Sequence, residues 1–266
     1  MFHPQGPTFF ELARQCLSST QQGYDLLAPK FDYTPFRTPD EILAGLASVI
    51  GTKQPINDAL DVCCGTGAAI GMLRELMRKP DLVGNAVPGI PERHGGPERH
   101  GGRSLQRVVG IDFSPGMLAV AREQFPATLT QPAVELVCGD VLEMSFREEF
   151  DLAVTAGSLG HILPRDEPQF VERIHAALRP GGRFAFVTAE MPPWWSRRAL
   201  ASRAFNAAMV VRNAVWRPAF IMYYLTFLMP DVQRLLEAQG FNVAVQRGVF
   251  AGPFRPLAVV VATKRG

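Results

Sequence analysis

The sequence predicts an α/β protein built on a doubly wound, mostly parallel sheet. Short runs of valine, isoleucine, alanine and leucine alternate with segments in which apolar residues recur at helical spacing. The apolar runs are nearly continuous, which is typical of strands covered on both faces. The first run leads into a turn of small residues, Cys63-Cys64-Gly65-Thr66-Gly67, that opens a helix. Turns of this kind bind nucleotide-like cofactors at the mouth of such sheets.

The elements of the core follow in a regular order. The predicted strands are Ala59–Cys63, Arg107–Ile111, Val134–Val137, Phe150–Thr155 and Arg183–Thr188. The predicted helices between them are Ala68–Met77, Pro115–Gln124 and Glu167–Leu178. Ser114 and Pro115 are suitable N-cap and first-turn residues for the second of these helices. The run Arg179-Pro180-Gly181-Gly182 is expected to end the third.

The chain length of 266 residues fits one large domain with a sizeable core. Near the C-terminus, Asp231–Ala238 is predicted as a helix closed by Gly240, followed by the strand pair Phe241–Val249 and Leu257–Thr263. We therefore expect a single domain of four parts. These are an N-terminal helical lid (1–56), a cofactor-binding core (57–190), a helical cap insertion (191–230) and a C-terminal helix with a strand pair (231–266).

Residues 80–106 interrupt the alternation of strands and helices. The hexapeptide PERHGG occurs twice there, at 91–96 and 97–102. A repeat of this composition has little apolar area to bury, so we expect a flexible, solvated insertion. His94 and His100 could bind a metal ion in principle, but the composition favours a duplicated loop and we predict no metal site.

Bulk composition restricts the cellular setting and the partners. The formal net charge of +2 does not predict binding to a nucleic acid. The four cysteines, Cys16, Cys63, Cys64 and Cys138, have no C-x-x-C spacing, so we expect free thiols in a reducing cytoplasm. The first residues lack the pattern of an export signal. The longest uncharged run of the cap, Pro218–Pro230, has 13 residues, which is well short of the roughly 20 that a membrane-spanning helix needs.

The small-residue turn departs from the dinucleotide fingerprint, because Ile70 stands where a third glycine or alanine is expected. Asp61-x-Cys63-x-Gly65-x-Gly67 instead resembles the first motif of the class I S-adenosylmethionine (SAM) dependent methyltransferases, in which glycine usually holds the place of Cys63. Four further segments stand in that family's order: Gly110–Met117, Gly139–Val141, Phe150–Ile162 and Leu178–Val187. The resemblance covers about residues 57–190 and is closest to the small-molecule group that includes quinone-biosynthesis methyltransferases.

The resemblance implies a Rossmann-like sheet of seven strands in the order 3-2-1-4-5-7-6, with the last strand antiparallel and helices on both faces. It also implies SAM as cofactor. Asp112 would accept the ribose hydroxyls, with Phe113 and Met117 beside the adenine, and Asp140 with the backbone of Val141 would bind the adenine amino group. Each has an alternative, because Asp112 and Asp140 could be turn residues and Phe113 and Met117 could belong to the core.

The remaining site residues lie in the turn and after the fourth strand. Asp61 is expected to organise the turn or to meet the SAM tail, while Gly65 and Gly67 let the backbone approach the cofactor. Cys63 would be strained if its φ angle is positive. Thr155 and Ala156 would line the space between methyl donor and acceptor.

We assign no catalytic residue from the sequence. His161 is a candidate general base, since the ordinary pKa of a histidine side chain lies near neutrality. A structural role is the alternative.

The acceptor is expected to meet segments outside the motifs. The resemblance implies a lid that closes over SAM, with Tyr24 and Tyr33 as its candidate residues, although the two could simply pack together. Residues 191–230 are predicted to form one or two amphipathic helices that cap the site with the apolar side inward. Such a cap favours a small, apolar or aromatic acceptor. The alternatives are that this surface packs on the sheet, on a second subunit of a homodimer, or against a membrane surface.

The predicted reaction is methyl transfer to oxygen, carbon or nitrogen by in-line displacement. Two other functions remain open at this point. One is a nicotinamide-linked oxidoreductase on a similar sheet, and the other is a non-catalytic SAM-fold protein that serves as a partner or regulatory subunit. A protein or RNA acceptor is disfavoured by the near-neutral charge.

Overall fold

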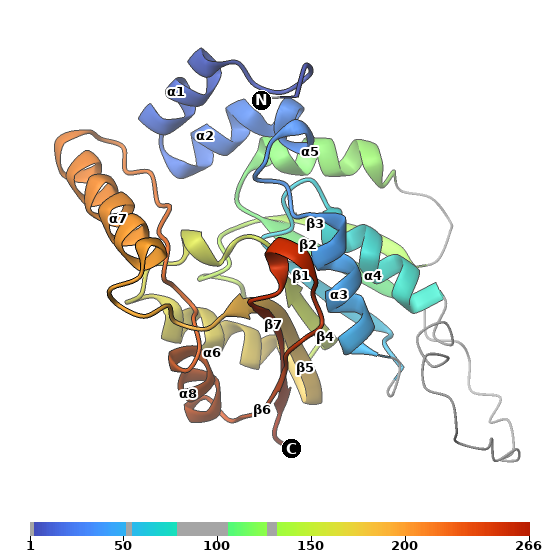
Figure 1. The fold of residues 1–266 in the computed structure, drawn as a ribbon. Coiled ribbons are helices and arrows are strands. Elements are labelled where there is room, and N and C mark those ends of the chain that lie inside the picture. The colour runs from blue at the N-terminus through green and yellow to red at the C-terminus, as the bar shows by residue number, and fades with distance from the viewer. Residues whose placement is uncertain (1–2, 52–54, 79–105, 127–131) are drawn as a thin grey trace, which may run out of the picture.

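The computed structural model describes residues 3–51, 55–78, 106–126 and 132–266. The predicted insertion at 80–106, with its repeated hexapeptide and both of its histidines, lies outside the described residues except for Gln106. The described chain forms a sheet flanked by helices on two sides, with two N-terminal helices above it (Figure 1).

The sheet has the predicted strand order, β3-β2-β1-β4-β5-β7-β6. The first five strands pair in parallel, and β7 pairs antiparallel with both β5 and β6. The strands are β1 (Asp58–Val62), β2 (Arg107–Asp112), β3 (Ala133–Cys138), β4 (Phe150–Thr155), β5 (Leu178–Ala189), β6 (Phe241–Gln246) and β7 (Leu257–Lys264). The prediction of a doubly wound, mostly parallel sheet is therefore confirmed.

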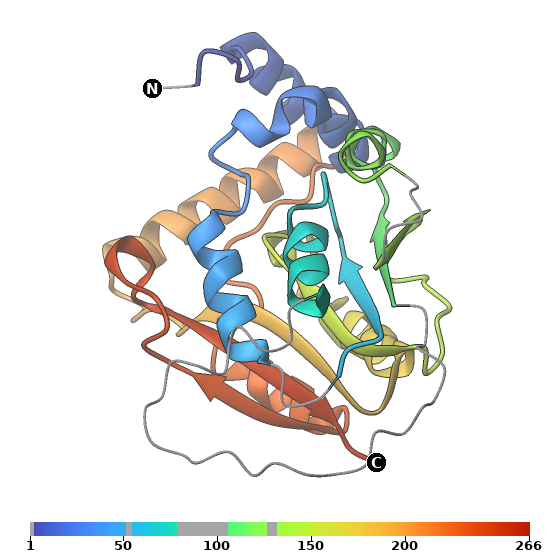
Figure 2. The ribbon, with the colours of Figure 1, turned by 90° about the vertical axis from the view of Figure 1, so that its right-hand side faces the viewer.

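Helices cover both faces of the sheet, as Figure 2 shows from the side. The α-helices are α1 (Phe9–Leu17), α2 (Thr20–Leu27), α3 (Asp40–Ile50), α4 (Ala68–Arg78), α5 (Pro115–Gln124), α6 (Glu167–Ala177), α7 (Arg197–Val215) and α8 (Asp231–Ala238). Short 3₁₀ segments are η1 (Ala28–Tyr33), η3 (Leu159–His161) and η4 (Gly252–Phe254).

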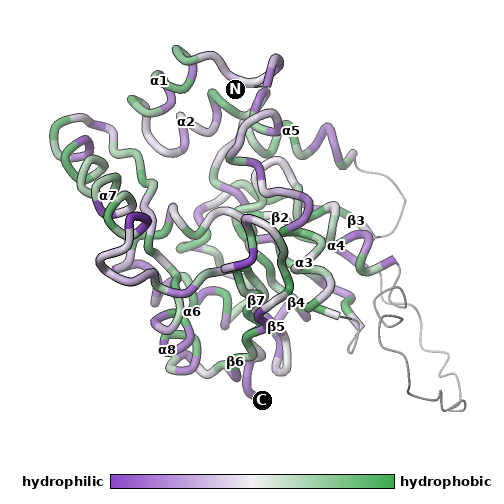
Figure 3. Tube along the Cα trace, in the orientation of Figure 1, coloured by the Kyte–Doolittle hydropathy of each residue, from purple (hydrophilic) through white to green (hydrophobic). Residues whose placement is uncertain are grey.

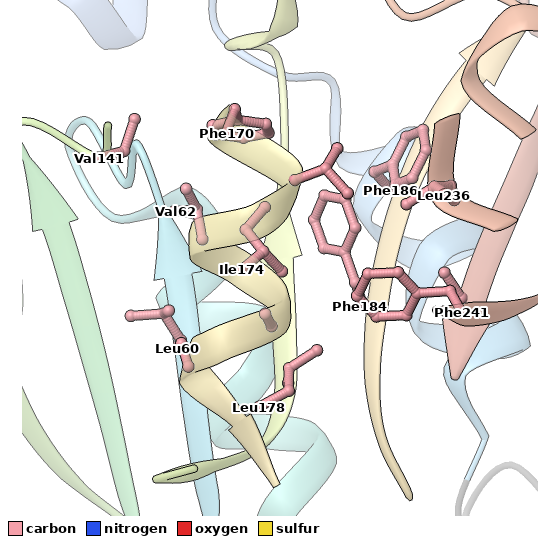
Figure 4. Close-up of a cluster of buried hydrophobic side chains, with 14 of the residues drawn as sticks. Leu60, Val62, Val141, Phe170, Ile174, Leu178, Phe184, Phe186, Leu236 and Phe241 are labelled. Atoms are coloured by element: carbon pink, nitrogen blue, oxygen red, sulfur yellow. The ribbon is translucent and has the colours of Figure 1, made fainter. Parts of the chain in front are cut away.

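Two apolar clusters, one on each face, hold these layers together. One joins α6 and α8 to the sheet through large side chains such as Phe170, Phe184 and Phe241 (Figure 4). The other joins α3 and α4 to the opposite face, with Leu46, Ile70 and Leu73 at its centre. Successive strand residues point to opposite faces, so continuous apolar runs are required to fill both clusters.

Strand β5 begins earlier than predicted. The run Arg179-Pro180-Gly181-Gly182, expected to end the preceding helix, lies inside β5, and the pairing of β5 with β4 is irregular between Phe150 and Leu152. Gly181 has φ of +77°, a left-handed conformation that suits glycine. The glycines thus bend a strand that pairs at both of its ends instead of separating it from α6.

Ionic contacts gather where β1, β2 and β4 begin. Asp58 of β1 accepts from Arg107 and from Arg179, each at 2.8 Å, and Arg179 also contacts Asp151 of β4 at 2.8 Å. Oδ2 of Asp151 accepts from the backbone N–H groups of Asn57 and Asp58. This network fixes the strands relative to one another at their amino ends. The candidate site lies at the other edge, at the carboxyl ends of the strands.

The cap differs from its prediction. Residues 191–230 contain one α-helix, α7, and of its residues only Ala199 is buried. Its large apolar side chains Leu200, Val210, Val211 and Val215 are exposed. The prediction that the apolar side of the cap faces inward is therefore wrong for these exposed side chains of α7. The side that faces the domain is mixed, with Phe205 and Met209 beside the polar Asn206 and Asn213.

Candidate active site

A cavity of about 290 Å³ opens at the carboxyl ends of β1, β2 and β4. Parallel strands converge there, and in doubly wound sheets such crevices bind ligands. Three groups of residues line it. The strand ends and their turns supply Asp61, Cys63, Cys64, Gly65, Thr66, Ala68, Ala69, Asp112, Phe113, Met117, Ala156, Gly157, Ser158 and His161; the N-terminal segment supplies Tyr24, Phe31, Phe36, Arg37 and Thr38; and the stretch after α7 supplies Met222 and Tyr224.

The turn after β1 is tied to β2 at two points. The backbone N–H of Cys64 donates to the carbonyl of Ile111 (3.0 Å), and that of Gly65 donates to Oδ2 of Asp112 (2.9 Å). Gly67, at φ of +95°, closes the turn where an added Cβ would stand 2.5 Å from the ring of Phe125. The absence of a side chain at Gly67 therefore permits a left-handed backbone and also lets Phe125 pack closely against the turn.

Cys63 has φ of +58°. A side chain in this left-handed region costs roughly 1–2 kcal/mol relative to an ordinary conformation. The sequence predicts strain at Cys63 only if its φ angle is positive. The angle is positive, so this turn is strained. Burial, and next the proximity of Asp112, raise the pKa of the Cys63 thiol, so the group is a neutral wall of the cavity and not a nucleophile.

Asp112 stands at the end of β2 with both oxygens engaged by backbone. Oδ2 accepts from Gly65 and Oδ1 accepts from the N–H of Ser114, each at 2.9 Å. Burial raises the pKa of Asp112, and these hydrogen bonds oppose the rise. The carboxylate is therefore oriented toward the cavity, where its remaining lone pairs are available to a ligand hydroxyl.

Asp61 is the least satisfied polar group of the site. It is 1% exposed, and its Oδ2 has no hydrogen-bond partner among the described residues. Burial, and next the nearby Asp112, raise the pKa of Asp61. Neither carboxylate takes part in an ion pair with another described residue. Two buried carboxylates without a cation favour a ligand that brings positive charge and hydrogen-bond donors.

The N-terminal segment is held by two aspartates against the end of the sheet where the cavity opens. Oδ1 of Asp25 accepts from Oγ of Ser114 (2.6 Å) and from the N–H of Gly116 (2.8 Å), at the start of α5. Asp32 accepts from Oγ1 of Thr66 (2.7 Å) and from Nε2 of Gln124 (2.9 Å). These bonds hold the N-terminal segment against the two turns that frame the cavity.

Sequence reasoning attributed the closing of the lid to Tyr24 and Tyr33, and only Tyr24 lines the cavity. Tyr33 stacks on His3 with ring centroids 4.9 Å apart. The residues that hold the lid, Asp25 and Asp32, were missed. Each follows an aromatic residue, in the pairs Tyr24-Asp25 and Phe31-Asp32, and this repeated pair was the available signal.

His161 joins three parts of the site. Its Nδ1 lies 2.6 Å from the carbonyl oxygen of Ile221, beyond α7, and its Nε2 lies 2.7 Å from the hydroxyl of Tyr24 on α2. A carbonyl can only accept, so Nδ1 carries the proton and Nε2 accepts from Tyr24. Burial lowers the pKa of His161, and the bond to Ile221 opposes that shift. The imidazole is therefore neutral at neutral pH.

Four predicted residues do not line the cavity. Thr155 donates to the carbonyl of Val62 and contacts Ser158, and Gly67 packs on Phe125. Oδ1 of Asp140 accepts from the N–H of Leu142, and Val141 is buried in the core. Contact of these four residues with a cofactor stays a prediction. Residues that the sequence did not single out, such as Phe36, Ser158, Met222 and Tyr224, line the cavity instead.

The geometry fits SAM. The orphaned oxygen of Asp61 can accept from the amino group of the methionine tail, and Asp112 can accept from the ribose hydroxyls. Gly65 has no atom within 4 Å of the position of a Cβ, so its backbone is open to a ligand. The two carboxylates complement the positive charge of the sulfonium and ammonium groups.

Comparison with known proteins agrees with this assignment. A model described as methyltransferase domain matches residues 98–182. The 2-phytyl-1,4-naphtoquinone methyltransferase of Thermosynechococcus vestitus is 30% identical over 186 residues, which are 66% of this chain and 67% of that protein.

The chain belongs to the class I SAM-dependent methyltransferases.

Two other relatives match over shorter lengths. The 2-phytyl-1,4-naphtoquinone methyltransferase of Nostoc punctiforme is 28% identical over 155 residues, 58% of this chain and 56% of that protein. The ubiquinone biosynthesis O-methyltransferase of Nitrobacter winogradskyi is 30% identical over 149 residues, 56% of this chain and 53% of that protein. The chain thus spans little more than half the length of these two relatives.

Solved structures share the fold. An O-methyltransferase family protein from Burkholderia thailandensis superimposes with a TM-score of 0.64 at 14% identity, covering 97% of this chain and 67% of the other. This likeness shows the fold alone. Membership of the family, shown by the relative above, gives SAM as the cofactor, and the nicotinamide-linked alternative is not supported. Within the described parts of the chain, no helix combines the length and apolar character needed to cross a bilayer.

Replacing the strained cysteine tests the geometry of the turn. We expect Cys63→Gly to raise the free energy of unfolding by roughly 0.5–1 kcal/mol, because glycine adopts the left-handed conformation without steric cost. Chemical denaturation measures the change. Cys63→Ala is the matched control, since it removes the thiol but keeps the strain. Equal stability of the two variants would contradict the account.

Removing the charge of Asp61 should change protein stability and cofactor binding in opposite directions. Asp61→Asn is expected to stabilise the ligand-free methyltransferase by roughly 1–3 kcal/mol at neutral pH, because a buried unpaired charge is removed. It should weaken SAM binding roughly tenfold or more. Thermal unfolding and calorimetric titration measure the two effects, with Glu172→Gln, at an exposed carboxylate on α6, as control.

The same variant has an expected pH dependence. Burial raises the pKa of Asp61 in the folded protein, so the folded state binds more protons than the unfolded state between the ordinary and the raised value. The parent protein should therefore lose stability as the pH rises through that window. Asp61→Asn should lack this part of the pH dependence, and an unchanged profile would show that Asp61 is not the group responsible.

Proposed function

We propose that this methyltransferase acts on a small, apolar or aromatic acceptor of the quinone or phenol type. The observation that carries the proposal is the character of the walls supplied by the lid and by the stretch after α7. They present Phe31, Phe36, Met222 and Tyr224. The charged group among them, Arg37, is paired with Asp40 at 2.9 Å. Aromatic and thioether walls favour a flat apolar ring.

The printed names of the relatives support the same class of acceptor. Two of them refer to a naphtoquinone and a third to ubiquinone biosynthesis. We extend this class to the present chain as a proposal, and take a hydroxyl oxygen or an electron-rich ring carbon as the atom that is methylated.

Bound SAM would supply a methyl group on a sulfonium sulfur, and the neutral thioether that is left after transfer is a good leaving group. The chain's own residues then have two tasks, alignment and the exclusion of water. We propose that Asp61, Gly65 and Asp112 hold the cofactor, with Cys63, Phe113, Met117 and Ala156 at its sides. The latches at Asp25 and Asp32 keep the lid closed over the cavity, which limits the entry of water during the reaction.

A hydroxyl acceptor must also lose a proton, and the pair formed by Tyr24 and His161 can take it. The acceptor hydroxyl would donate to the oxygen of Tyr24 while the tyrosine proton passes to Nε2 of His161, which is already its hydrogen-bond acceptor (2.7 Å). Burial raises the pKa of Tyr24, so the tyrosine conducts the proton without ionising first. His161 would become the imidazolium, with Nδ1 still donating to Ile221.

The proposed acceptor class is tested by following the methyl label. The methyltransferase is incubated with methyl-labelled SAM and, separately, the lipid-soluble and water-soluble fractions of a cell extract. We expect label in an organic-soluble aromatic product, and none with the Asp112→Ala variant, which should not hold the cofactor. Label confined to protein, RNA or a polar metabolite would overturn the proposal.

The proton path is tested by Tyr24→Phe with Tyr33→Phe as the matched control. With a phenolic acceptor, we expect Tyr24→Phe to lower kcat by about 10²-fold, and Tyr33→Phe to leave it unchanged. Because burial lowers the pKa of His161, the parent rate should stay level as the pH falls through 6.5 and decline only below that value. An unchanged kcat and pH profile in Tyr24→Phe would exclude the path.

A further inference from the structure

Helix α7 presents an apolar stripe to solvent, while its less exposed side carries Phe205 and Met209 together with polar residues. At 100° per residue, Leu200, Ala204, Ala207, Val211 and Val215 share one face. All five are exposed, Val211 at 62% and Val215 at 80%. In Figure 1 the helix stands at the margin of the molecule, with only its inner side toward the other elements.

The opposite side of α7 is attached by polar contacts. Asn206 exchanges two hydrogen bonds with the backbone of Tyr224, and Asn213 does the same with Phe220. Arg212 donates to the carbonyls of Cys16 and Ser18 at the end of α1. These bonds fix the rotation of the helix, so the apolar stripe is held outward by the fold and cannot turn inward without breaking them.

Tryptophans lie at both ends of this stripe. The three tryptophans of the chain all fall in the cap, at 194, 195 and 216. They are 69%, 67% and 49% exposed. The indole N–H of Trp216 donates to the carbonyl of Leu17, which places the exposed side chain of Leu17 beside the end of the stripe. Exposed tryptophan is enriched where proteins meet the interface of a bilayer.

The charge of the cap has one sign. Residues 191–230 contain five arginines and no lysine, aspartate or glutamate, whereas the whole chain has a formal net charge of only +2. Arg197, Arg198, Arg203 and Arg217 are exposed. In Figure 3, hydrophilic and hydrophobic stretches alternate along α7 at the edge of the molecule. The segment therefore combines apolar, indole and cationic groups on one outer surface.

We propose that this surface, made of the α7 stripe, the three tryptophans and the exposed arginines, docks the methyltransferase on an anionic lipid bilayer. Apolar side chains enter the boundary between headgroups and acyl chains, while arginines contact the acidic headgroups. A second copy of the chain is a poorer match, because it would bring a second set of exposed arginines to a segment that contains no acidic residue. The inference does not depend on the identity of the acceptor.

Docking is measured with vesicles and with the intrinsic tryptophan emission, which reports on this surface alone because no other part of the chain contains tryptophan. Vesicles of equal parts phosphatidylglycerol and phosphatidylcholine should bind the full-length protein and shift the emission to shorter wavelength. Phosphatidylcholine alone should bind it weakly, and added salt should weaken binding to the anionic vesicles.

Two variants dissect the surface. Arg197→Gln with Arg198→Gln should weaken binding about thirtyfold at low salt, from the loss of two arginines near the lipid surface. Arg122→Gln with Arg147→Gln, which removes two exposed arginines outside the cap, should have little effect. Val211→Ser with Val215→Ser should reduce binding roughly tenfold without lowering the melting temperature, since both side chains are already in water.

Two outcomes would overturn the proposal. One is failure of the anionic vesicles to bind or to shift the emission. The other is an emission shift that follows protein concentration without lipid, together with sedimentation as a dimer, which would assign the stripe to a second copy of the chain.

Discussion

Two buried carboxylates that lack a cation are the constraint on which the site depends. Asp61 and Asp112 are brought together because β1 and β2 are adjacent and parallel, so their carboxyl ends meet at one edge of the sheet. In the ligand-free protein burial raises the pKa of both groups, and the proximity of Asp112 adds to the rise for Asp61, so two charged carboxylates are unfavourable there. A cationic cofactor relieves the repulsion. The site thus gives up stability for affinity, which is common where binding residues are pre-arranged.

The neighbouring structure keeps this arrangement in place. The turn after β1 holds Cys63 in a left-handed conformation, and Gly65 donates to Asp112, so the backbone and the carboxylate fix each other. The lid is attached to the same elements through Asp25 and Asp32. His161 then connects the lid, the strand end and the stretch after α7 in one hydrogen-bonded chain. Movement of any of these parts therefore changes the walls of the cavity.

The position of the cap relates the cavity to the outer surface. The stretch that follows α7 contributes Met222 and Tyr224 to the cavity, while α7 itself turns its apolar stripe to the outside. An apolar acceptor and a lipid-facing helix are compatible features, because a substrate that partitions into a bilayer is most concentrated at its surface. Each inference is nevertheless tested separately, one by the labelled product and the other by vesicle binding.

The sequence by itself determined the alternation of strands and helices, and its resemblance to a known family implied the strand order and the cofactor. These predictions depend on local spacing, which can be recognised in the sequence without the structure. The features used were the continuous apolar runs, the turn at Asp61–Gly67 and the acidic residue at 112. Tertiary structure alone decided which residues meet. Asp25 and Asp32 act on turns some 34 to 91 residues away, and the face of α7 that points outward is set by the partners of Asn206, Arg212 and Asn213. A helical pattern shows that an apolar face exists, but only the packed chain shows whether that face meets the core or the solvent.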